Sequence, residues 1–500
     1  MQSAKSTYTS SFPGSSGSRR RKHRTPIPQR EKILLLLLSI LLVFMPWALG
    51  SMHVWSQVTA LAMAVGIFVY SLLPPPPSFS QNHEEEKAAA PWKQLLRFPI
   101  FWIGLLLLAY VAIQGFNPSW VYVEFGGEFW MVPIDYVYWL PSGMDTPFHD
   151  MDAFRYLIIL SIPWLIVCGA WVGLSRKRSI RFLFWVLAIN SLVLALVGFS
   201  QALLESEKIL NLYETNARFL STFIYRNHAA AYFNLMLGIA AGMGFYHFLK
   251  GKDEGKESTP APLFAFFGIL FALIVAISAS RMGILITGAL LSLIFLGGIF
   301  IFILKRNFNL PSLIAGAVLC LLMGGFTFFA IRSIDLEDVT QRLEYLWAGE
   351  FNVSQEARYH ANQATLDMLE DNWIYGWGAG SFRFYFPVYQ QEYPEIFTRR
   401  GQFLLWEYAH NDLLQLPVEF GAVGSAFFAL GLAYWLWLIL VKRGFKDMII
   451  LWALIALVAT VVHSGADFIF HNPAILTTWA FVLALIGKLS VLQRREDEPR

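Results

Sequence analysis

The amino-acid sequence predicts an all-α polytopic membrane protein with about 12 transmembrane helices and one large, partly helical loop between spans 9 and 10. Hydrophobic residues make up 56% of the 500 positions and charged residues only 15%, whereas soluble domains are near half apolar and a quarter charged. The apolar residues gather in runs of roughly 20, the length that crosses the hydrocarbon core as a helix. Lys and Arg cluster between alternate runs. These three observations predict a chain that is embedded in a lipid bilayer.

Twelve apolar segments are long enough to be spans. The seventh and eighth form one apolar stretch that is too long for a single crossing, so we divide it at Ser280-Arg281. The expected spans cover residues 33–50, 54–73, 99–115, 154–174, 182–203, 228–249, 263–280, 282–304, 309–331, 413–441, 447–463 and 474–490.

The chain before the first span is rich in Ser, Gly and Arg. Residues 1–32 are therefore expected to form a disordered basic tail. The first apolar run ends in Ala48-Leu49-Gly50, a small-x-small pattern of the kind that signal peptidases cleave. The length of the tail, bulky Trp47 and the many later spans favour an uncleaved first span.

The positions of Lys and Arg predict the orientation, because basic residues are retained on the cytoplasmic side. With the basic tail inside, spans 1–9 occupy residues 33–331, spans 10–12 occupy 413–490, and the tail 491–500 returns to the cytoplasm. Most of the 38 Lys and Arg then fall inside, and the outer loop 116–151 contains none. The loop 332–412 is then expected on the non-cytoplasmic side of the membrane.

This large loop, residues 332–412, is the only extramembrane segment long enough to carry its own structure, and loops of that length are usually functional. It contains two helix-like stretches, residues 336–347 and 357–369, followed by the glycine-rich turn YGWGAGSF at 375–382. It ends beside the tenth span, where Asn411 or Asp412 is expected to cap the helix.

Four motifs in order resemble one known family. The run His410-Asn411-Asp412-Leu413-Leu414-Gln415, followed by Glu419-Phe420-Gly421, resembles the signature of the O-antigen ligase and polysaccharide polymerase superfamily. Ser280-Arg281 at a span junction, Arg358 ahead of the GWGAGSF turn, and His463, Asp467 and Pro473 between the last two spans follow the same pattern. The resemblance covers roughly residues 220–475.

The resemblance implies transfer of a glycan from undecaprenyl pyrophosphate to an acceptor hydroxyl at the periplasmic face. In O-antigen ligases the acceptor is the lipid A–core of lipopolysaccharide, and in the polymerases it is another lipid-linked repeat unit. The sequence leaves these two alternatives open, together with the sugar, the linkage and the need for a chain-length regulator. A single displacement at the anomeric carbon predicts inversion.

The residues of these motifs suit that chemistry. Arginine stays charged and grips phosphate oxygens bidentately, so Arg281 and Arg358 are the expected ligands of the pyrophosphate. A sugar hydroxyl is a weak nucleophile at neutral pH, and His410 is the expected catalytic base. Arg281 could instead snorkel to the interface, and Arg358 could instead form a salt bridge in the loop.

Other polar residues are expected on the same side of the membrane. They are candidates for substrate binding, although helix-start polarity or the pinning of a turn explains them equally well. They are Arg226, His228, Asn411, His463 and Asp467.

No cofactor is expected, because no carboxylate or His/Cys cluster has convincing metal-ligand spacing. The net charge of +3 is too small to indicate a nucleic-acid partner. The alternative function is a transporter or a flippase of lipid-linked glycans, since many of these have twelve spans. That alternative expects charged residues at mid-membrane depth, whereas these spans are nearly free of charge.

Overall fold

Long helices make up most of the protein. The computed structural model describes residues 26–74, 90–126, 128–215, 217–255, 258–304, 353–399 and 402–497, together with position 325. Each expected span that lies within the described residues is a helix. The helices are α1 (Gln29–Trp47), α2 (Val54–Leu72), α5 (Pro99–Phe116), α6 (Ala153–Gly173), α7 (Lys177–Leu203), α8 (Arg226–Asp253), α9 (Ala261–Ile277), α10 (Arg281–Leu304), α16 (Asp412–Val441), α17 (Met448–Ser464) and α18 (Pro473–Asp497).

The predicted all-α polytopic membrane fold is confirmed. Eight of the described helices are long and apolar enough to cross a membrane, and α9 and α17 are shorter apolar helices. The expected ninth span, residues 309–331, lies outside the described residues apart from position 325, as does the expected helix 336–347. The expected helix 357–369 is present as the longer α13 (Val353–Asp371).

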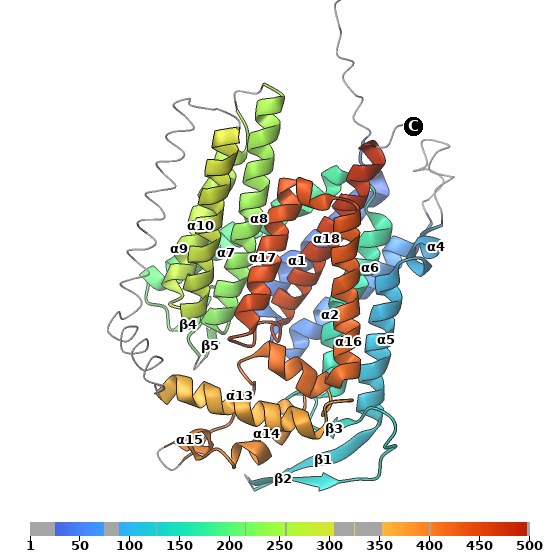
Figure 1. Cartoon of the computed structure of the whole chain (residues 1–500), viewed down its shortest axis with the longest axis vertical. Helices are drawn as coiled ribbons and strands as arrows, with labels where there is room; N and C mark the ends of the chain where they lie inside the picture. The colour runs from blue at the N-terminus through green and yellow to red at the C-terminus, as the bar shows by residue number, and fades with distance from the viewer. Residues whose placement is uncertain are drawn as a thin grey trace, which may run out of the picture.

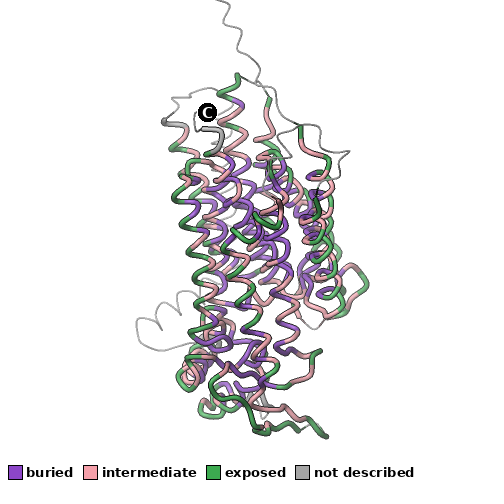
Figure 2. Tube along the Cα trace, turned by 90° about the vertical axis from the view of Figure 1, so that its right-hand side faces the viewer, coloured by how far each residue is buried: buried purple, intermediate pink, exposed green. Residues whose placement is uncertain are grey.

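The helices form one bundle that is held together at its centre by close packing. Buried residues line the middle of the bundle, and exposed residues lie along the outer helices (Figure 2). Helix α8 packs against α9 and α17. At Gly238 of α8, a side chain would overlap Ala456 of α17, so the absence of a side chain lets the two backbones approach. Small residues are typical of contacts between membrane helices, where lipid gives no hydrophobic drive for association.

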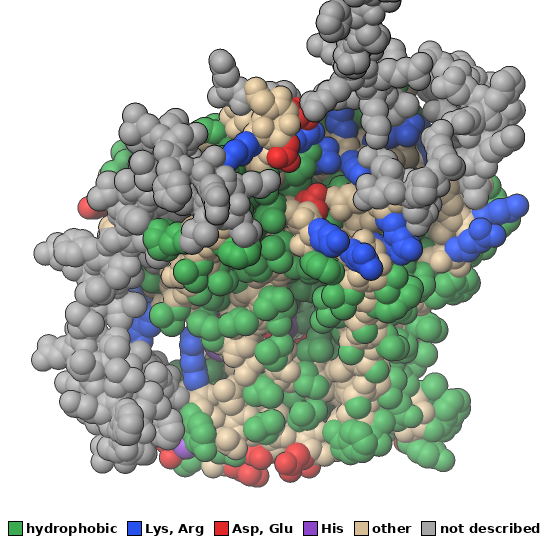
Figure 3. All heavy atoms as spheres, turned by 45° about the horizontal axis from the view of Figure 1, so that its top comes forward, with side chains coloured by type: hydrophobic (Ala, Val, Ile, Leu, Met, Phe, Trp, Pro, Cys, Tyr) green, Lys and Arg blue, Asp and Glu red, His purple; other side chains and the backbone are tan. Residues whose placement is uncertain are grey.

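The chain begins and ends at the same end of the bundle. The start of α1 and the end of α18 lie together at the top of Figure 1, opposite the end that carries β1, β2 and α13. We call the latter the loop end. At the other end, Glu31 of α1 accepts hydrogen bonds from the backbone of Ser175 and Arg176 in the α6–α7 turn. Figure 3 brings this other end forward and shows Lys and Arg side chains gathered there above hydrophobic flanks.

The loop end contains a small β-sheet that the all-α prediction did not include. Strands β1 (Pro118–Phe125) and β2 (Glu128–Pro133) are antiparallel, and β3 (Gly143–Asp145) lies parallel to β1. Trp120 and Tyr122 on one face of β1 contact α14 (Phe382–Gln390). Trp120 and Tyr122 therefore pack against the core formed with α13 and α14, whereas Trp130, Tyr138 and Trp139 are exposed.

Several short elements complete the described chain. They are η1 (Leu49–Ser51), α4 (Pro91–Leu96), β4 (Lys208–Ile209), β5 (Tyr213–Glu214), α15 (Pro394–Phe397), β6 (Thr398–Arg399), β7 (Gln402–Phe403) and η3 (Gly444–Lys446). The expected break between the seventh and eighth spans is confirmed, because α9 ends at Ile277 and α10 begins at Arg281, with Ala279 at a φ of 51° between them.

The tenth span differs from the continuous helix that hydropathy predicts. Helix α16 is broken at Gly421, whose φ of 61° and ψ of −173° are not helical. The glycine-rich turn packs into the break, where the backbone N–H groups of Ala422 and Val423 donate to Trp373 O and Ile374 O at 2.7 and 3.1 Å. Because these partners satisfy the freed backbone groups, the break is stable inside the protein.

Candidate active site

His410 lies in the turn that leads into α16, at the loop end. Its φ of 53° is in the left-handed region, which a residue with a Cβ adopts only when its surroundings hold it there. The preceding backbone is held by Gln415, whose Oε1 accepts a hydrogen bond from Ala409 N at 2.9 Å. The His410 side chain keeps 34% of its surface exposed. It is therefore fixed in place and still accessible.

The partner of His410 is Asp467, in the turn between α17 and α18. His410 Nδ1 lies 3.0 Å from Asp467 Oδ1, and the carboxylate is only 4% exposed. Asp467 also accepts hydrogen bonds from Phe468 N at 2.9 Å and from the Asn227 side chain. Burial raises the pKa of Asp467, but the hydrogen bond and charge of His410 outweigh burial and lower it to about 2. The carboxylate is ionised at neutral pH.

The predicted cationic residues gather around the same turn. Arg358 on α13 donates from Nη1 to Ala466 O at 3.2 Å, one residue before Asp467. Arg226, at the start of α8, lies within electrostatic range of Asp467, Arg281 and Arg218. Arg281 and Arg358 are both exposed. Arg358 thus contacts the α17–α18 turn directly, Arg226 lies within electrostatic range of it, and Arg281 lies within electrostatic range of Arg226.

The other predicted polar residues lie deeper. His228 is fully buried, with Nε2 2.9 Å from Phe468 O, and His463 is 1% exposed. In this conformation both lie behind the surface that a substrate would contact. Asn411 occupies the N-cap position of α16 without a side-chain hydrogen bond to the helix. Asp412 does not cap α16 either, because its carboxylate accepts from Phe470 N at 2.7 Å and contacts His471 Nδ1 at 2.6 Å.

The glycine-rich turn shapes the end of the site rather than offering free N–H groups. Its N–H groups at Trp377 and Gly378 donate to Val418 O and Glu419 O of α16 at 2.8 and 3.0 Å. Gly378 has a φ of 104°, and a Cβ there would lie 2.5 Å from the Cα of Gly143 in β3. Only glycine fits this contact between α16 and the sheet.

Two contacts in the site were not indicated by any sequence motif. Arg383 of α14 lies 3.6 Å from Glu407 and 5.3 Å from the centre of the Tyr408 ring, two residues before His410. The Asp412–His471 pair joins a residue that was expected to cap α16 to a histidine in the α17–α18 turn. Their pairing follows from packing alone.

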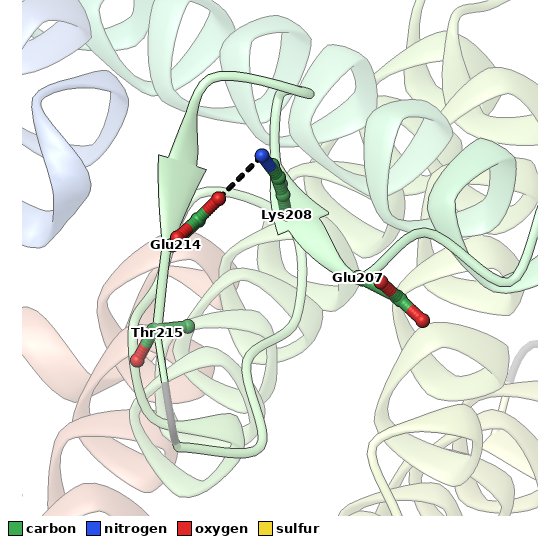
Figure 4. A pocket seen from close by; sticks show the side chains of 4 residues that line it. All are labelled: Glu207, Lys208, Glu214 and Thr215. Atoms are coloured by element: carbon green, nitrogen blue, oxygen red, sulfur yellow. Dashed lines mark ion pairs between the residues drawn. The ribbon is translucent and has the colours of Figure 1, made fainter.

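A separate cavity of about 620 Å³ lies at the β4–β5 hairpin and is lined by Glu207, Lys208, Glu214 and Thr215 (Figure 4). Lys208 forms an ion pair with Glu214 across it. No residue predicted for the active site lines this cavity, and its cation is already neutralised. It offers no counterpart to the group around His410.

Comparison with known protein families gives one match. A family described as O-Antigen ligase matches residues 266–429, from α9 into α16, a segment that contains Arg281, Arg358 and His410. No curated protein matches the chain. Asp467 and Arg226 lie outside the matched segment but pack onto the site it forms. The match supports the placement of residues 266–429 in the O-antigen ligase and polysaccharide polymerase superfamily.

Proposed function

We propose that this protein transfers a glycan from undecaprenyl pyrophosphate to an acceptor hydroxyl at the periplasmic face of the inner membrane. The observation that carries the proposal is the His410–Asp467 pair, whose imidazole is accessible and whose carboxylate is buried, with Arg358 bonded to the same turn and Arg226 within electrostatic range of Asp467. The O-antigen ligase match over residues 266–429 supports it.

His410 acts as the base. A hydrogen bond donated by Nδ1 to Asp467 leaves Nε2 as the lone-pair nitrogen of the neutral ring. Nε2 accepts the proton of the acceptor hydroxyl while its oxygen bonds to the anomeric carbon and the bond from that carbon to the pyrophosphate breaks. The ionised Asp467 stabilises the imidazolium that forms. One displacement inverts the anomeric centre and requires no metal.

The arginines stabilise the leaving group. As the glycosidic bond breaks, negative charge grows on the pyrophosphate, and guanidinium groups aimed at its oxygens lower the energy of that state. Arg281 and Arg358 are assigned to the pyrophosphate because both are exposed, Arg281 at the start of α10 and Arg358 on α13. Arg226 adds positive potential from the start of α8. Arg218, which no motif indicated, joins this group.

The proposed orientation follows from the basic residues. Lys and Arg gather at the end of the bundle opposite the site (Figure 3), and basic residues are retained on the cytoplasmic side. Both termini are therefore assigned to the cytoplasm, and the loop end with His410 to the periplasm.

The central test replaces His410 by Ala, with the protein produced at its normal level in the native host. We expect the loss of the surface glycan and the accumulation of donor lipid on the outer leaflet. An unchanged surface glycan would exclude His410 as the base. Donor accumulating on the inner leaflet of a deletion strain would instead support the flippase alternative.

The acceptor is resolved by the glycan profile of the same deletion strain. Loss of long chains, with single repeats still attached to lipid A–core, indicates a polymerase, which would also call for a chain-length regulator as partner. Free polymer on the undecaprenyl carrier indicates a ligase.

A further inference from the structure

Two carboxylate–histidine pairs join the start of α16 to the α17–α18 turn, in reciprocal order. The start of α16 contributes His410 to one pair and Asp412 to the other, two residues later. The turn contributes Asp467 to the first and His471 to the second. Each segment therefore supplies one acid and one imidazole, and both pairs are formed through Nδ1.

The two pairs differ in accessibility. The His410 side chain is 34% exposed, whereas the His471 and Asp412 side chains are only 10% and 6% exposed. A substrate can reach the first imidazole, but the second is covered by protein. The Asp412–His471 pair is therefore suited to hold other groups in place.

The buried pair is tied to the backbone that carries Asp467. The second carboxylate oxygen of Asp412 accepts from Phe470 N at 2.7 Å, and Asp412 N lies 3.4 Å from Asp467 O. Asp412 thus contacts the turn at three points, through Asp467, Phe470 and His471. A rigid turn keeps the carboxylate of Asp467 at its distance from His410.

Aromatic packing reinforces the same contact. The Tyr408 ring stacks on Phe468, with ring centres 4.4 Å apart and planes 5° from parallel, and the edge of His471 meets Tyr408 at 4.8 Å. His410 meets Phe468 edge-on at 4.9 Å. Both histidines of the two pairs therefore pack on one aromatic stack, so a displacement of His471 is transmitted to His410.

We propose that Asp412 and His471 are positioning residues, which act by holding the α17–α18 turn so that Asp467 keeps His410 in the reactive orientation. This inference rests on the proposed function. It assigns to two buried residues a role in turnover without contact with either substrate.

The electrostatics agree with a tightly held pair. Burial alone would lower the pKa of His471, but the charge and hydrogen bond of Asp412 raise it above its ordinary value, with Glu419 adding to the rise and Arg383 opposing it. Removing one partner would leave a buried polar group without its counterpart.

The test compares two substitutions of His471. His471→Phe keeps a ring on Tyr408 but removes the donor to Asp412. His471→Asn places an amide donor where Nδ1 lies. Purified protein in nanodiscs is given lipid-linked glycan extracted from a strain lacking this protein, together with lipid A–core so that either acceptor is present, and the released undecaprenyl pyrophosphate is quantified. We expect His471→Phe to lower kcat on the order of 10- to 100-fold, as removal of an outer hydrogen-bond partner does, with the KM for the donor unchanged, and His471→Asn to retain most of kcat.

A double-substitution cycle separates positioning from general destabilisation. In the Asp467→Ala variant, His410 has already lost the carboxylate through which His471 is proposed to act. His471→Phe should therefore lower the residual kcat of that variant by less than about twofold. His149→Phe is the matched control, because His149 forms an exposed pair with Asp150, and it should leave kcat unchanged.

The outcomes distinguish the two proposals. Equal loss of kcat in both backgrounds, or full activity of His471→Phe, overturns the positioning role while leaving the function in place. Full activity of His410→Ala overturns the proposed function itself.

Discussion

Asp467 provides the sharpest prediction, because two substitutions can separate its negative charge from its role in orienting His410. Its pKa of about 2, against an ordinary value of 3.8, corresponds to about 2 kcal/mol in favour of the ionised form in the folded protein. The hydrogen bond and charge of His410 are the largest causes that lower the pKa of Asp467. Since 1.4 kcal/mol is tenfold in rate, loss of the charge alone should reduce kcat about 30-fold.

Asp467→Asn removes the charge and keeps the shape. Its Oδ1 must remain the acceptor, because Phe468 N donates to that position, and the Asn227 amide can rotate to face the new NH₂ group. The hydrogen bond to His410 survives as a neutral one. Asp467→Ala removes the acceptor as well, so His410 loses its orientation, and we expect a fall in kcat on the order of 10²- to 10⁴-fold.

The assay is release of undecaprenyl pyrophosphate by protein in nanodiscs, with equal amounts of folded protein verified by size-exclusion chromatography. Asp371→Asn is the control, because Asp371 is on α13 at the loop end and its carboxylate accepts an exposed hydrogen bond from the Tyr389 hydroxyl at 2.6 Å. If Asp467→Ala keeps kcat within threefold of the unsubstituted protein, the His410–Asp467 mechanism is refuted.

The charge of Asp467 also predicts the pH dependence of stability. A depressed pKa contributes stability that is present above the unfolded-state value of 3.8 and is lost as the pH falls through about 2. Asp467→Asn should therefore lower the thermal midpoint at pH 7, and the difference from the unsubstituted protein should shrink below pH 4.

Three further predictions concern the donor site and the turn beside it. Arg358→Ala should raise the KM for the lipid-linked donor on the order of 10-fold, which corresponds to the loss of one charge-assisted hydrogen bond. Arg358→Lys should give an intermediate KM. An unchanged KM would show that Arg358 does not bind the pyrophosphate. Gly378→Ala should lower the thermal midpoint by the equivalent of about 2 kcal/mol or more, since its φ of 104° and the 2.5 Å approach to Gly143 leave no room for a methyl group; a midpoint equal to the parent's would contradict this. Tyr110→Phe should cost about 1–3 kcal/mol of stability because its hydroxyl donates to two carbonyls, one in the turn and one in α16, and a fluorescence melt in detergent measures it.

The spans could be predicted because each depends on its own residues. Hydropathy placed the ends of α2, α5, α6 and α16 within a residue or two of those in the structure, since transfer of a helix from water to lipid is decided segment by segment. The break at Ser280-Arg281 was predictable for the same reason, because a single crossing cannot use so long an apolar stretch.

The break in α16 could not be predicted in this way. Pro417 and Gly421 both permit a departure from helix, but many membrane helices contain such residues without breaking. The break forms because Trp373 and Ile374, about fifty residues earlier, supply carbonyls to the freed N–H groups. The small sheet of the outer loop likewise depends on contacts with α14 that the order of residues does not reveal.

By itself the sequence determined the membrane class, the positions of the spans, the segregation of basic residues and the motifs that resemble the O-antigen ligase superfamily, because these properties reside in local stretches of chain. Only the tertiary structure decided which side chains meet. His410 and Asp467 are 57 residues apart and pair because α16, α17 and α18 pack side by side, and the same packing pairs Asp412 with His471. A hydrogen bond depends on distance and direction between atoms, and packing sets both.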